Sequence, residues 1–489
     1  MNKVRVRFAP SPTGFLHVGG LRTALYDSLL ARKNGGAFIL RIEDTDQTRL
    51  VEGGVENIIR TLQWAGIEPD EGPYLDSDGT VRQRGNFGPY VQSERLDIYR
   101  KYVDQLIEGG QAYRCYCTSE RLEDMRERQR SEGGQTMYDR HCRGLDDEAC
   151  KRLESEGRPF VVRLAVPTEG VTGWDDLIRG RVEIANSQID DQVLMKSDGF
   201  PTYHLAVVVD DRLMGITHVL RGEEWCPSTP KHILLYQAFG WPQPEYAHLP
   251  LLLNKDRSKL SKRQGDVAVE DYKKKGYLPE ALVNFVALLG WNPSGDREIY
   301  SVDELVSSFD LNKVNRGGAV FDLEKLDWMN SEYIKSCSED DLAERAMPFF
   351  EAAGFSDRAA IVKAVRLEKN RVKTLAEMPE RLTFIFVDPD PDSQRLPWKK
   401  STPEIAKDRL TGLRDFLSSL DVKDFDSREG LEKTVLEMIV ERGWTNAETL
   451  WPMRVALTGL AASPGPFEVA WAIGREATLR RIDSAIEKI

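Results

Sequence analysis

Cysteine is scarce in this sequence, with six residues in a chain of 489. So few thiols in so long a chain do not make a disulfide framework of the kind that small secreted proteins use. Long hydrophobic runs are also missing. None approaches the ~20 apolar residues that span a bilayer, and the N-terminus does not resemble a signal peptide. We therefore expect a protein of the reducing cytoplasm that has no contact with a membrane.

An excess of positive charge is missing as well. Lys and Arg total 67 against 79 Asp and Glu, and the resulting net charge of −12 argues against a general nucleic-acid binder. The charge is unevenly distributed, however, because residues 254–276 hold eight Lys or Arg against four Asp or Glu. With 41% hydrophobic and 30% charged residues, the composition is that of a globular protein, and the length predicts several domains.

The stretch from residue 4 to residue 46 predicts a βαβ unit. Apolar residues alternate with arginine over 4–8, as in a strand, and the Pro and Gly residues at 10–14 end it. Leu and Ala then recur at helical spacing from 21 to 29, and Asn34-Gly35-Gly36 is typical of a helix C-terminus. Residues 37–42 form an apolar run that predicts a buried parallel strand.

A ligand site is expected where the two strands of this unit end. Arg7 lies near the end of the first strand and Glu43 just past the second, so both should reach the crevice in which open α/β sheets bind ligands. Gly19 and Gly20 let a ligand approach the backbone, and the following helix offers N–H groups to a phosphate. His17 adds a side-chain donor there. A turn that only closes the βαβ unit is the alternative.

The remaining sequence continues the α/β pattern and then becomes helical. It predicts a doubly wound, Rossmann-type parallel-sheet domain with an α+β insertion, followed by an all-α C-terminal half. We expect five segments: the first half of the α/β domain at 1–112, the insertion at 113–190, the second half at 191–255, a region with a basic loop at 256–330, and the helical region at 331–489. We also expect an exposed loop at 70–90, helix caps at Ser93 and Thr229, and a helical segment at 359–378.

Five motifs, in order, resemble those of bacterial glutamyl-tRNA synthetases over essentially the whole chain: APSPTGFLHVGG, RIEDTD, YHLAVVVDD, LRGEEW and KLSKR. HVGG corresponds to the HIGH signature of class I synthetases and KLSKR to their KMSKS signature. The resemblance implies a monomeric enzyme that uses ATP and Mg²⁺ to form glutamyl-adenylate and transfers glutamate to the terminal ribose of tRNA-Glu. The insertion would then bind the tRNA acceptor end, residues 256–330 the stem and residues 331–489 the anticodon.

Amino-acid activation depends on positioning and on cations, because charge builds on the phosphates of ATP while pyrophosphate leaves. The run 259–263 would be a solvated basic loop if it stood alone. Paired with the HVGG turn, it supplies Lys259 and Lys262 to one side of the nucleotide. His17 and the amides of Gly19 and Gly20 would hold the other side. No covalent nucleophile is needed, and none is obvious.

The substrate pocket follows from the charge of glutamate, which has two carboxylates and an ammonium. Arg7, Arg221 and Glu43 fall at the ends of predicted strands facing one crevice, and Arg suits bidentate recognition of a carboxylate. The resemblance implies that Arg7 and Tyr203 bind the side-chain carboxylate, that Glu43 binds the amine, and that Ser11 and Arg221 complete the pocket. Structural ion pairs are the alternative. Glutamine would leave a buried Arg unpaired, so selectivity needs no editing domain.

Cysteines in the insertion form the one metal-like cluster of the sequence. Cys115, Cys117 and Cys142 could bind Zn²⁺ tetrahedrally with a fourth ligand. Some relatives use Cys-x-Cys and then Cys-x-His, but the position two after Cys142 is Gly144. A related family has a Tyr four residues before its last Cys, which matches Tyr138, and His141 is a further candidate. Three reduced thiols without a metal are the alternative.

Arg371 aligns with the family position that contacts the last anticodon base, where Arg accompanies strict selectivity for tRNA-Glu. A surface Arg on an amphipathic helix is the alternative. For the whole chain, the competing hypothesis is a tRNA-binding or regulatory protein without catalysis. A glutaminyl enzyme would carry C-terminal β-barrels, and the short glutamyl-queuosine synthetase would lack the helical half.

Overall fold

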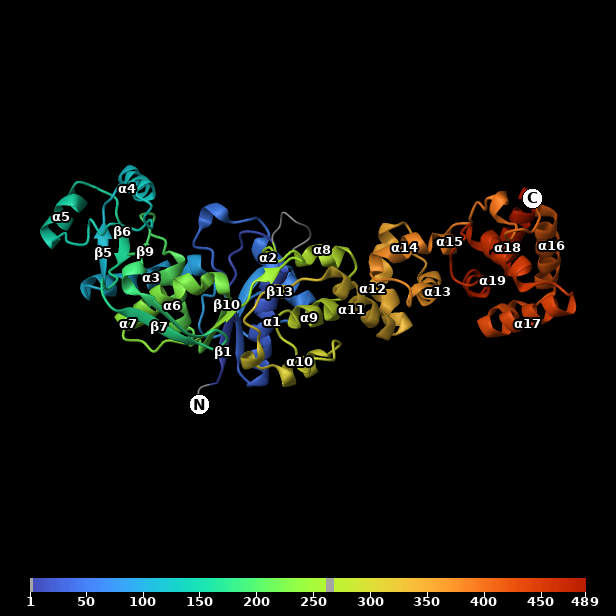
Figure 1. Cartoon of the computed structure of the whole chain (residues 1–489), viewed down its shortest axis with the longest axis horizontal. Coiled ribbons are helices and arrows are strands. Elements are labelled where there is room, and N and C mark those ends of the chain that lie inside the picture. The colour runs from blue at the N-terminus through green and yellow to red at the C-terminus, as the bar shows by residue number, and fades with distance from the viewer. Residues whose placement is uncertain (1–2, 261–267) are drawn as a thin grey trace. The chain divides into compact units, whose positions relative to one another are not determined.

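The computed structural model describes residues 3–260 and 268–489, and the chain divides into two compact units. The first comprises Met1–Tyr272 with Pro279–Leu323, and the second comprises Lys273–Leu278 with Glu324–Ile489. The first unit combines strands and helices, whereas the described residues of the second form helices without strands (Figure 1). The expected fold class, an α/β domain followed by an all-α half, is confirmed.

The first unit begins with the expected βαβ unit. Strands β1 (Arg5–Phe8) and β2 (Ala37–Leu40) pair in parallel, and α1 (Val18–Lys33) packs against both. The helix ends at Lys33 with Asn34 as its C-cap, and Gly35 follows with φ of +58°. A Cβ on Gly36 would lie 2.0 Å from the carbonyl oxygen of Val4, so only glycine allows the chain to re-enter the sheet there.

The parallel arrangement resumes with β10 (His218–Gly222) and β11 (Glu245–Leu249). Strand β10 lies beside β1, where the Thr217 amide donates to the Arg5 carbonyl over 2.9 Å (Figure 1). The carboxyl ends of β1, β2 and β10 therefore meet at one edge, which is where a doubly wound sheet places its ligand.

Other strands of the first unit extend this sheet or form separate sheets. Strands β7 (Val171–Asp176) and β8 (Gly180–Ala185) form an antiparallel pair that extends the sheet from β11. Strands β5 (Ala112–Cys115), β6 (Val161–Leu164) and β9 (Val193–Met195) form a separate antiparallel sheet. A short parallel pair joins β12 (Leu252–Leu253) to β13 (Ala319–Val320).

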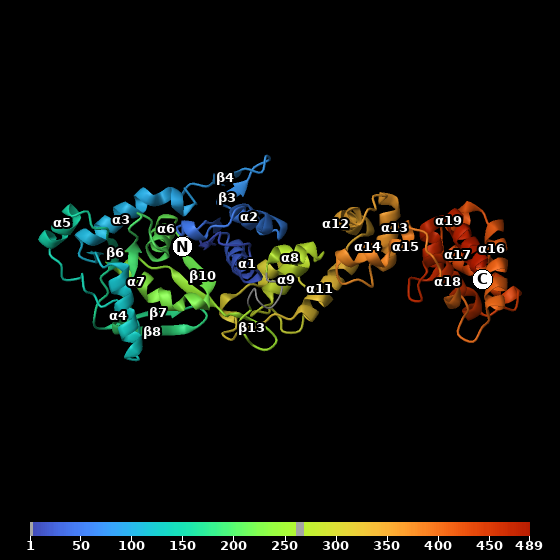
Figure 2. The same cartoon turned by 90° about the horizontal axis from the view of Figure 1, so that it is seen from above.

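Helices cover these sheets on several sides (Figures 1 and 2). One buried cluster joins residues of α3 (Leu96–Glu108), α6 (Tyr203–Leu213) and α7 (Thr229–Ala238) to the β5–β6–β9 sheet. The other helices up to residue 308 are α2 (Gly54–Trp64), α4 (Ser119–Ser131), α5 (Asp147–Ser155), α8 (Val269–Lys274), α9 (Pro279–Ala287) and α10 (Val302–Ser308).

Three local expectations in the first unit were wrong. The segment 70–90 contains an antiparallel hairpin of β3 (Gly72–Leu75) and β4 (Val81–Arg84), which extends beside α2 (Figure 2). Ser93 does not cap a helix. Its amide donates to the Asp44 carboxylate over 2.8 Å, and α3 begins after a 3₁₀ turn. The N-cap of α7 is Ser228 rather than Thr229. The Thr229 hydroxyl instead accepts a hydrogen bond from Arg221.

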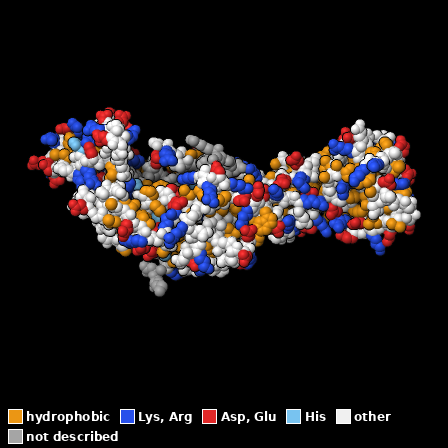
Figure 3. Space-filling view, in the orientation of Figure 1, with side chains coloured by type: hydrophobic (Ala, Val, Ile, Leu, Met, Phe, Trp, Pro, Cys, Tyr) orange, Lys and Arg blue, Asp and Glu red, His pale blue; other side chains and the backbone are white. Residues whose placement is uncertain are grey.

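The second unit is a set of packed helices: α11 (Leu323–Ser336), α12 (Glu339–Ala352), α13 (Arg358–Glu368), α14 (Met378–Arg381), α15 (Thr383–Phe386), α16 (Pro403–Ser419), α17 (Arg428–Glu441), α18 (Asn446–Thr458) and α19 (Pro466–Lys488). The expected helical segment at 359–378 stops at Glu368, so Arg371 lies in a turn. None of the described helices has the length and apolar character needed to cross a bilayer. Basic and acidic side chains are interspersed on the face seen in Figure 3.

Candidate functional site

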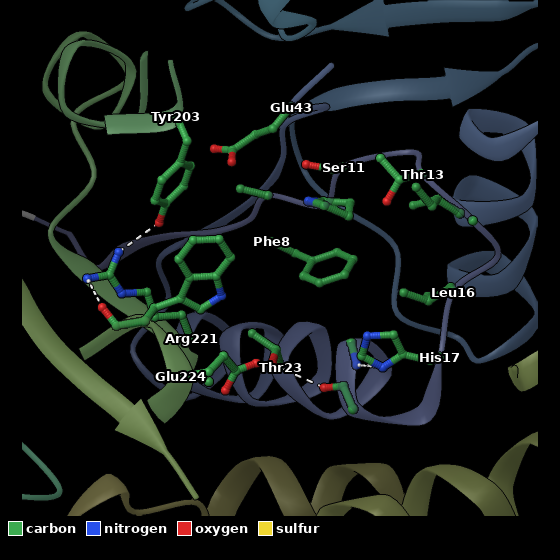
Figure 4. A pocket seen from close by; sticks show the side chains of 18 of the residues that line it. Phe8, Ser11, Thr13, Leu16, His17, Thr23, Glu43, Tyr203, Arg221 and Glu224 are labelled. Carbon is green, nitrogen blue, oxygen red and sulfur yellow. Dashed lines mark hydrogen bonds between the residues drawn. The ribbon is translucent and has the colours of Figure 1, made fainter. Parts of the chain in front are cut away.

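A cavity of about 850 Å³ opens at the carboxyl ends of β1, β2 and β10. Such a volume is within the range of small-molecule sites. Figure 4 shows Tyr203, Glu43 and Arg221 toward one side of this cavity and His17 toward the other. The structure brings together nine residues named from the sequence: Arg7, Ser11, His17, Gly19, Gly20, Glu43, Tyr203, Arg221 and Lys259. Lys262 lies outside the described residues.

The HVGG turn is organised by its histidine. His17 is the N-cap of α1, and its Nδ1 accepts a hydrogen bond of 3.0 Å from the Gly20 amide. A neutral imidazole with an accepting Nδ1 carries its proton on Nε2, so His17 is a donor at that atom. A Cβ on Gly20 would lie 2.7 Å from Leu16 Cδ1, so a larger residue there would have to displace the end of the Leu16 side chain. Of the two amides expected to face a phosphate, that of Gly20 is therefore engaged within the turn.

Lys259 reaches the cavity because the chain turns back on itself after β12. Leu253 and Lys259 form an antiparallel bridge, and the Asn254 amide donates to the Ser258 carbonyl over 2.8 Å. Lys259 and Leu260 consequently line the same cavity as His17. The HVGG turn and the first residues of KLSKR, separated by about 240 positions in the sequence, thus lie at one site.

Arg7 and Glu43 belong to a buried ionic network. Arg7 Nε donates to Asp211 Oδ1 over 3.1 Å, and Arg41 Nη1 donates to the same oxygen over 2.7 Å. Arg41 also donates from Nη2 to Glu43 Oε1 over 3.0 Å. All four side chains are at least nine-tenths buried. The structural ion pairs considered as an alternative are therefore present at Arg7 and Glu43, although both side chains also line the cavity.

The network shifts the protonation of its carboxylates in opposite directions. Burial raises the pKa of Asp211, but Arg7 and Arg41 outweigh it and hold that pKa below its usual value. Burial raises the pKa of Glu43 above its usual value, although Arg41 and Arg7 lower it. Asp211 is thus the charged centre of the network.

Arg221 is held differently, by neutral acceptors. Its Nη1 donates to the Tyr203 hydroxyl over 2.8 Å and its Nη2 to Thr229 Oγ1 over 2.8 Å. Its Nε donates to His248 Nε2 over 3.1 Å, and Nη1 lies 3.3 Å from His232 Nδ1. Among the residues that the structure describes, no carboxylate forms an ion pair with Arg221. Its positive charge therefore remains available to an anionic ligand.

Sequence reasoning missed the side chains that hold the two arginines. Arg41 and Asp211 lie within the RIEDTD and YHLAVVVDD motifs, but nothing in those letters shows that they meet. His232 and His248 lie in α7 and β11, outside the quoted motifs. Their neighbours in space are distant in sequence, so no spacing rule could have found them.

Acid should lower the stability of the first unit because two of its histidines, His204 and His232, are neutral in the folded state. His204 Nδ1 lies 3.2 Å from His232 Nε2, and burial lowers the pKa of His204 to about 3. An unfolded histidine has a pKa of about 6.5, so the unfolded chain binds more protons below that pH and stability falls toward pH 3. We expect the urea midpoint of the first unfolding transition to fall less between pH 7.5 and 4.5 in His204→Gln than in wild type. Parallel pH profiles in the two proteins would refute this origin.

The cysteine cluster of the insertion forms a compact set of ligand atoms. The sulfurs of Cys115, Cys117 and Cys142 all lie within 4.8 Å of one another. The Tyr138 hydroxyl is 3.3 Å from the sulfurs of both Cys115 and Cys117 and accepts from the Cys142 amide over 3.0 Å. The His141 side chain is exposed and is not a member of this group. A hydrogen bond from Cys142 lowers the pKa of the Cys115 thiol below its usual value.

Arg371 follows α13 and is partly exposed, at 44% of its side-chain surface. Its guanidinium lies 3.6 Å from a Glu368 oxygen and 3.7 Å from a Glu468 oxygen. These contacts are longer than strong hydrogen bonds, so the group is loosely held. The interpretation of Arg371 as an arginine on the face of a helix was wrong, because it lies in a turn.

Comparison with known proteins agrees with this architecture. Residues 3–328 match the family model described as the catalytic domain of class I tRNA synthetases (E and Q), and residues 341–486 match a model described as an anticodon binding domain.

Full-length relatives show the same affiliation. A glutamate–tRNA ligase of Chloroherpeton thalassium is 48% identical, over 99% of this chain and 98% of its own. One of Clostridioides difficile is 45% identical over 98% of each chain. A crystal structure of a glutamate tRNA ligase from Elizabethkingia meningosepticum, in complex with its amino acid, matches with a TM-score of 0.88 and 38% identity over 99% of both chains. The chain described here thus belongs to the class I tRNA synthetases (E and Q) and, within them, to the glutamate–tRNA ligase family.

Proposed function

We propose that this chain ligates L-glutamate to tRNA-Glu in two steps. ATP, as its Mg²⁺ complex, first reacts with the α-carboxylate of glutamate to form glutamyl-adenylate and pyrophosphate. The glutamyl group is then transferred to the 3′-terminal ribose of the tRNA. One observation supports the choice of substrate above others: Arg221 is bonded to neutral acceptors and, among the described residues, has no carboxylate partner, so the cavity retains a cation for an anionic amino acid.

Glutamate would lie at the Tyr203–Glu43–Arg221 side of the cavity. Arg7 and Tyr203 are proposed to bind its side-chain carboxylate, with Tyr203 donating the proton that its bond from Arg221 leaves unused. Glu43 would receive the ammonium on Oε2, since only Oε1 is bonded to Arg41. Ser11 and Arg221 would complete the pocket from the loop after β1 and from β10.

ATP would lie at the other side, between the HVGG turn and the KLSKR segment. His17 is proposed to donate from Nε2 to a phosphate, and Gly19 and Gly20 to let the nucleotide approach the backbone. Lys259 and Lys262 would offset the negative charge that develops on the phosphates as pyrophosphate leaves. The protein supplies position and charge, and its residues form no covalent intermediate.

Glutamate-dependent exchange of pyrophosphate into ATP tests the proposed function. We expect exchange with L-glutamate but not with L-glutamine, measured with and without tRNA-Glu. Exchange supported by glutamine instead would reverse the specificity. Absence of exchange in every condition, together with binding of tRNA-Glu, would favour a tRNA-binding protein without catalysis.

Arg371 is proposed to contact the last anticodon base of tRNA-Glu. Its exposed and loosely paired guanidinium can exchange its carboxylate contacts for a base edge. We expect Arg371→Gln to narrow the preference for tRNA-Glu over tRNA-Gln about tenfold, because one base contact is worth about 1–3 kcal/mol. The measurement is kcat/KM for aminoacylation of each tRNA. Arg358→Gln, another exposed arginine of this unit, is the control, and equal preferences in both variants would refute the contact.

The cysteine cluster is proposed to hold a structural Zn²⁺ through Cys115, Cys117, Cys142 and Tyr138. In a tetrahedral site, Zn–S bonds of about 2.3 Å place the sulfur atoms roughly 3.8 Å from one another. The sulfur atoms of Cys117 and Cys142 are 3.6 Å apart. A bound ion would fix the loop 138–142 against β5.

Metal analysis of two cysteine variants tests this ligand set. We expect Cys142→Ser to contain little zinc after purification, and Cys150→Ser, from α5 of the same segment, to retain about one ion per chain. Equal zinc contents in the two variants, or none in wild type, would rule out the site.

The enzyme is further proposed to act as a monomer in the cytoplasm. Light scattering on the purified chain, with and without tRNA-Glu, checks the oligomeric state.

A further inference from the structure

A buried chain of hydrogen bonds lies behind Arg221. Asp176, the last residue of β7, approaches His248 Nδ1 to 2.5 Å, and His248 Nε2 accepts from Arg221 Nε at 3.1 Å. Asp176 and His248 are fully buried as side chains, and Arg221 is 5% exposed. In the paired strands, Arg221 stands opposite His248, and Asp176 stands opposite Tyr246. The three residues thus come from three adjacent strands of one sheet.

The chain of bonds requires one tautomer of His248. A carboxylate only accepts and a guanidinium only donates. His248 must therefore donate from Nδ1 to Asp176 and accept at Nε2 from Arg221. The opposite tautomer would place an N–H against the Arg221 N–H and a lone pair against the carboxylate, so both bonds would be lost together.

The arrangement also holds the Arg221 guanidinium without placing a carboxylate of the described residues in direct contact with it. A carboxylate in place of the imidazole would hold Arg221 equally well but would cancel the charge that an anionic substrate must meet. The neutral ring fixes the guanidinium while the negative charge of Asp176 stays one residue further away. Arg7 shows the contrast, since Asp211 contacts it directly.

We propose that Asp176 and His248 are positioning residues for substrate recognition: Asp176 sets the tautomer of His248, and His248 sets the direction in which Arg221 presents its guanidinium to the amino acid. The proposal rests on the proposed function and extends it to two residues that do not touch the substrate. A misdirected guanidinium lowers the affinity for glutamate and leaves the nucleotide side of the cavity unchanged.

Asp176→Asn separates this role from packing. Asp176 Oδ1 already accepts from the amides of Ile178, Arg179 and His248 at 3.1, 3.0 and 3.2 Å. An asparagine must keep its carbonyl oxygen there, which turns its NH₂ toward His248 Nδ1. His248 then carries its proton on Nε2 and repels the Arg221 donor.

Kinetics of pyrophosphate exchange give the first test. In Asp176→Asn we expect the KM for glutamate to rise on the order of tenfold to a hundredfold, since small misplacements of a binding group have effects of this size. The KM for ATP should change less than threefold. An unchanged KM for glutamate, or equal rises for both substrates, would overturn the proposal.

Variants of His248 provide the matched comparison and cover the case in which Asp176→Asn fails to fold. His248→Gln offers an amide oxygen to Arg221 and an NH₂ to Asp176, so its KM for glutamate should stay within about threefold of wild type. His248→Leu has no acceptor and should resemble Asp176→Asn. If Asp176 acts through His248, the double variant Asp176→Asn/His248→Leu should be no worse than His248→Leu alone. Additive losses would contradict that order of action.

A spectroscopic signature gives a readout that packing does not mimic. The chain has only six histidines, so ¹⁵N-histidine labelling yields few imidazole signals. We expect the His248 ring to be protonated at Nδ1 in wild type, its signal to be absent in His248→Gln, and the ring to be converted to the Nε2–H form in Asp176→Asn. An Nε2–H tautomer of His248 in wild type would overturn the proposal. A wild-type enzyme without glutamate-dependent exchange would instead overturn the proposed function itself.

Discussion

Arg221→Met is expected to lower kcat/KM for L-glutamate in pyrophosphate exchange by about two to three orders of magnitude. Truncating one partner of a buried charged contact costs about 2–5 kcal/mol, and methionine keeps much of the side-chain volume while removing the charge. Arg7 and Tyr203, the residues proposed to bind the side-chain carboxylate that distinguishes glutamate from glutamine, are unchanged in this variant. The preference for glutamate over glutamine should therefore be retained while the activity falls.

The control for this variant is Arg212→Met, an identical change at an exposed position of α6. It should leave the kinetics within about twofold of wild type. Arg221→Lys should not restore activity, because an ammonium cannot serve the acceptors now bonded to Nε, Nη1 and Nη2. Near-normal kinetics in Arg221→Met, with a melting temperature like that of wild type, would show that Arg221 is only structural.

His17→Asn is expected to reduce kcat for pyrophosphate exchange by about 10²–10³-fold, with little change in stability. Asparagine places an oxygen near the position of Nδ1, so it can still accept from the Gly20 amide and cap α1. It has no group at the position of Nε2, so it loses the donor proposed to meet the phosphates. Removing one donor to developing charge typically costs this factor.

His17→Ala provides the comparison, because it removes both the cap and the donor. Its activity should fall about as far as that of His17→Asn, and the unit should in addition lose about 1 kcal/mol of stability. Full activity in His17→Asn would mean that the histidine serves only the helix. A loss of stability equal to that of His17→Ala would mean that asparagine does not replace the cap.

The βαβ unit could be predicted from sequence because its signals are local. The alternation of apolar residues and arginine over 4–8, the turn at Gly35 with its φ of +58°, and the apolar run at 37–42 each depend on residues within a few positions of one another. The β3–β4 hairpin could not, because Gly72 and Pro73 are poor strand formers that become extended only by pairing with Arg84 and Gln83. The cap expected at Ser93 failed for a related reason: its amide is bonded to Asp44, 49 positions away.

The candidate site shows the same division. Glu43 and Arg221, which lie within motifs, and Arg7, which lies just before one, could be named from spacing and resemblance, and they do line one cavity. What the sequence could not show is the state of each charge. Arg7 shares Asp211 with Arg41, whereas Arg221 is surrounded by imidazoles and hydroxyls, and this difference exists only in three dimensions.

The oxygen of Asp211 that binds both Arg7 and Arg41 also limits how this enzyme can change its amino acid. Through Arg41 the same bridge reaches Glu43, so the groups proposed for opposite ends of the substrate share one buried support. Replacing Arg41 would remove the cation that is hydrogen-bonded to Glu43, and replacing Asp211 would remove the carboxylate that is bonded to Arg7. A change of amino-acid substrate would therefore require substitutions at several of these positions together. Selection on Arg41 and Asp211, which do not line the cavity, helps to preserve the substrate of the enzyme.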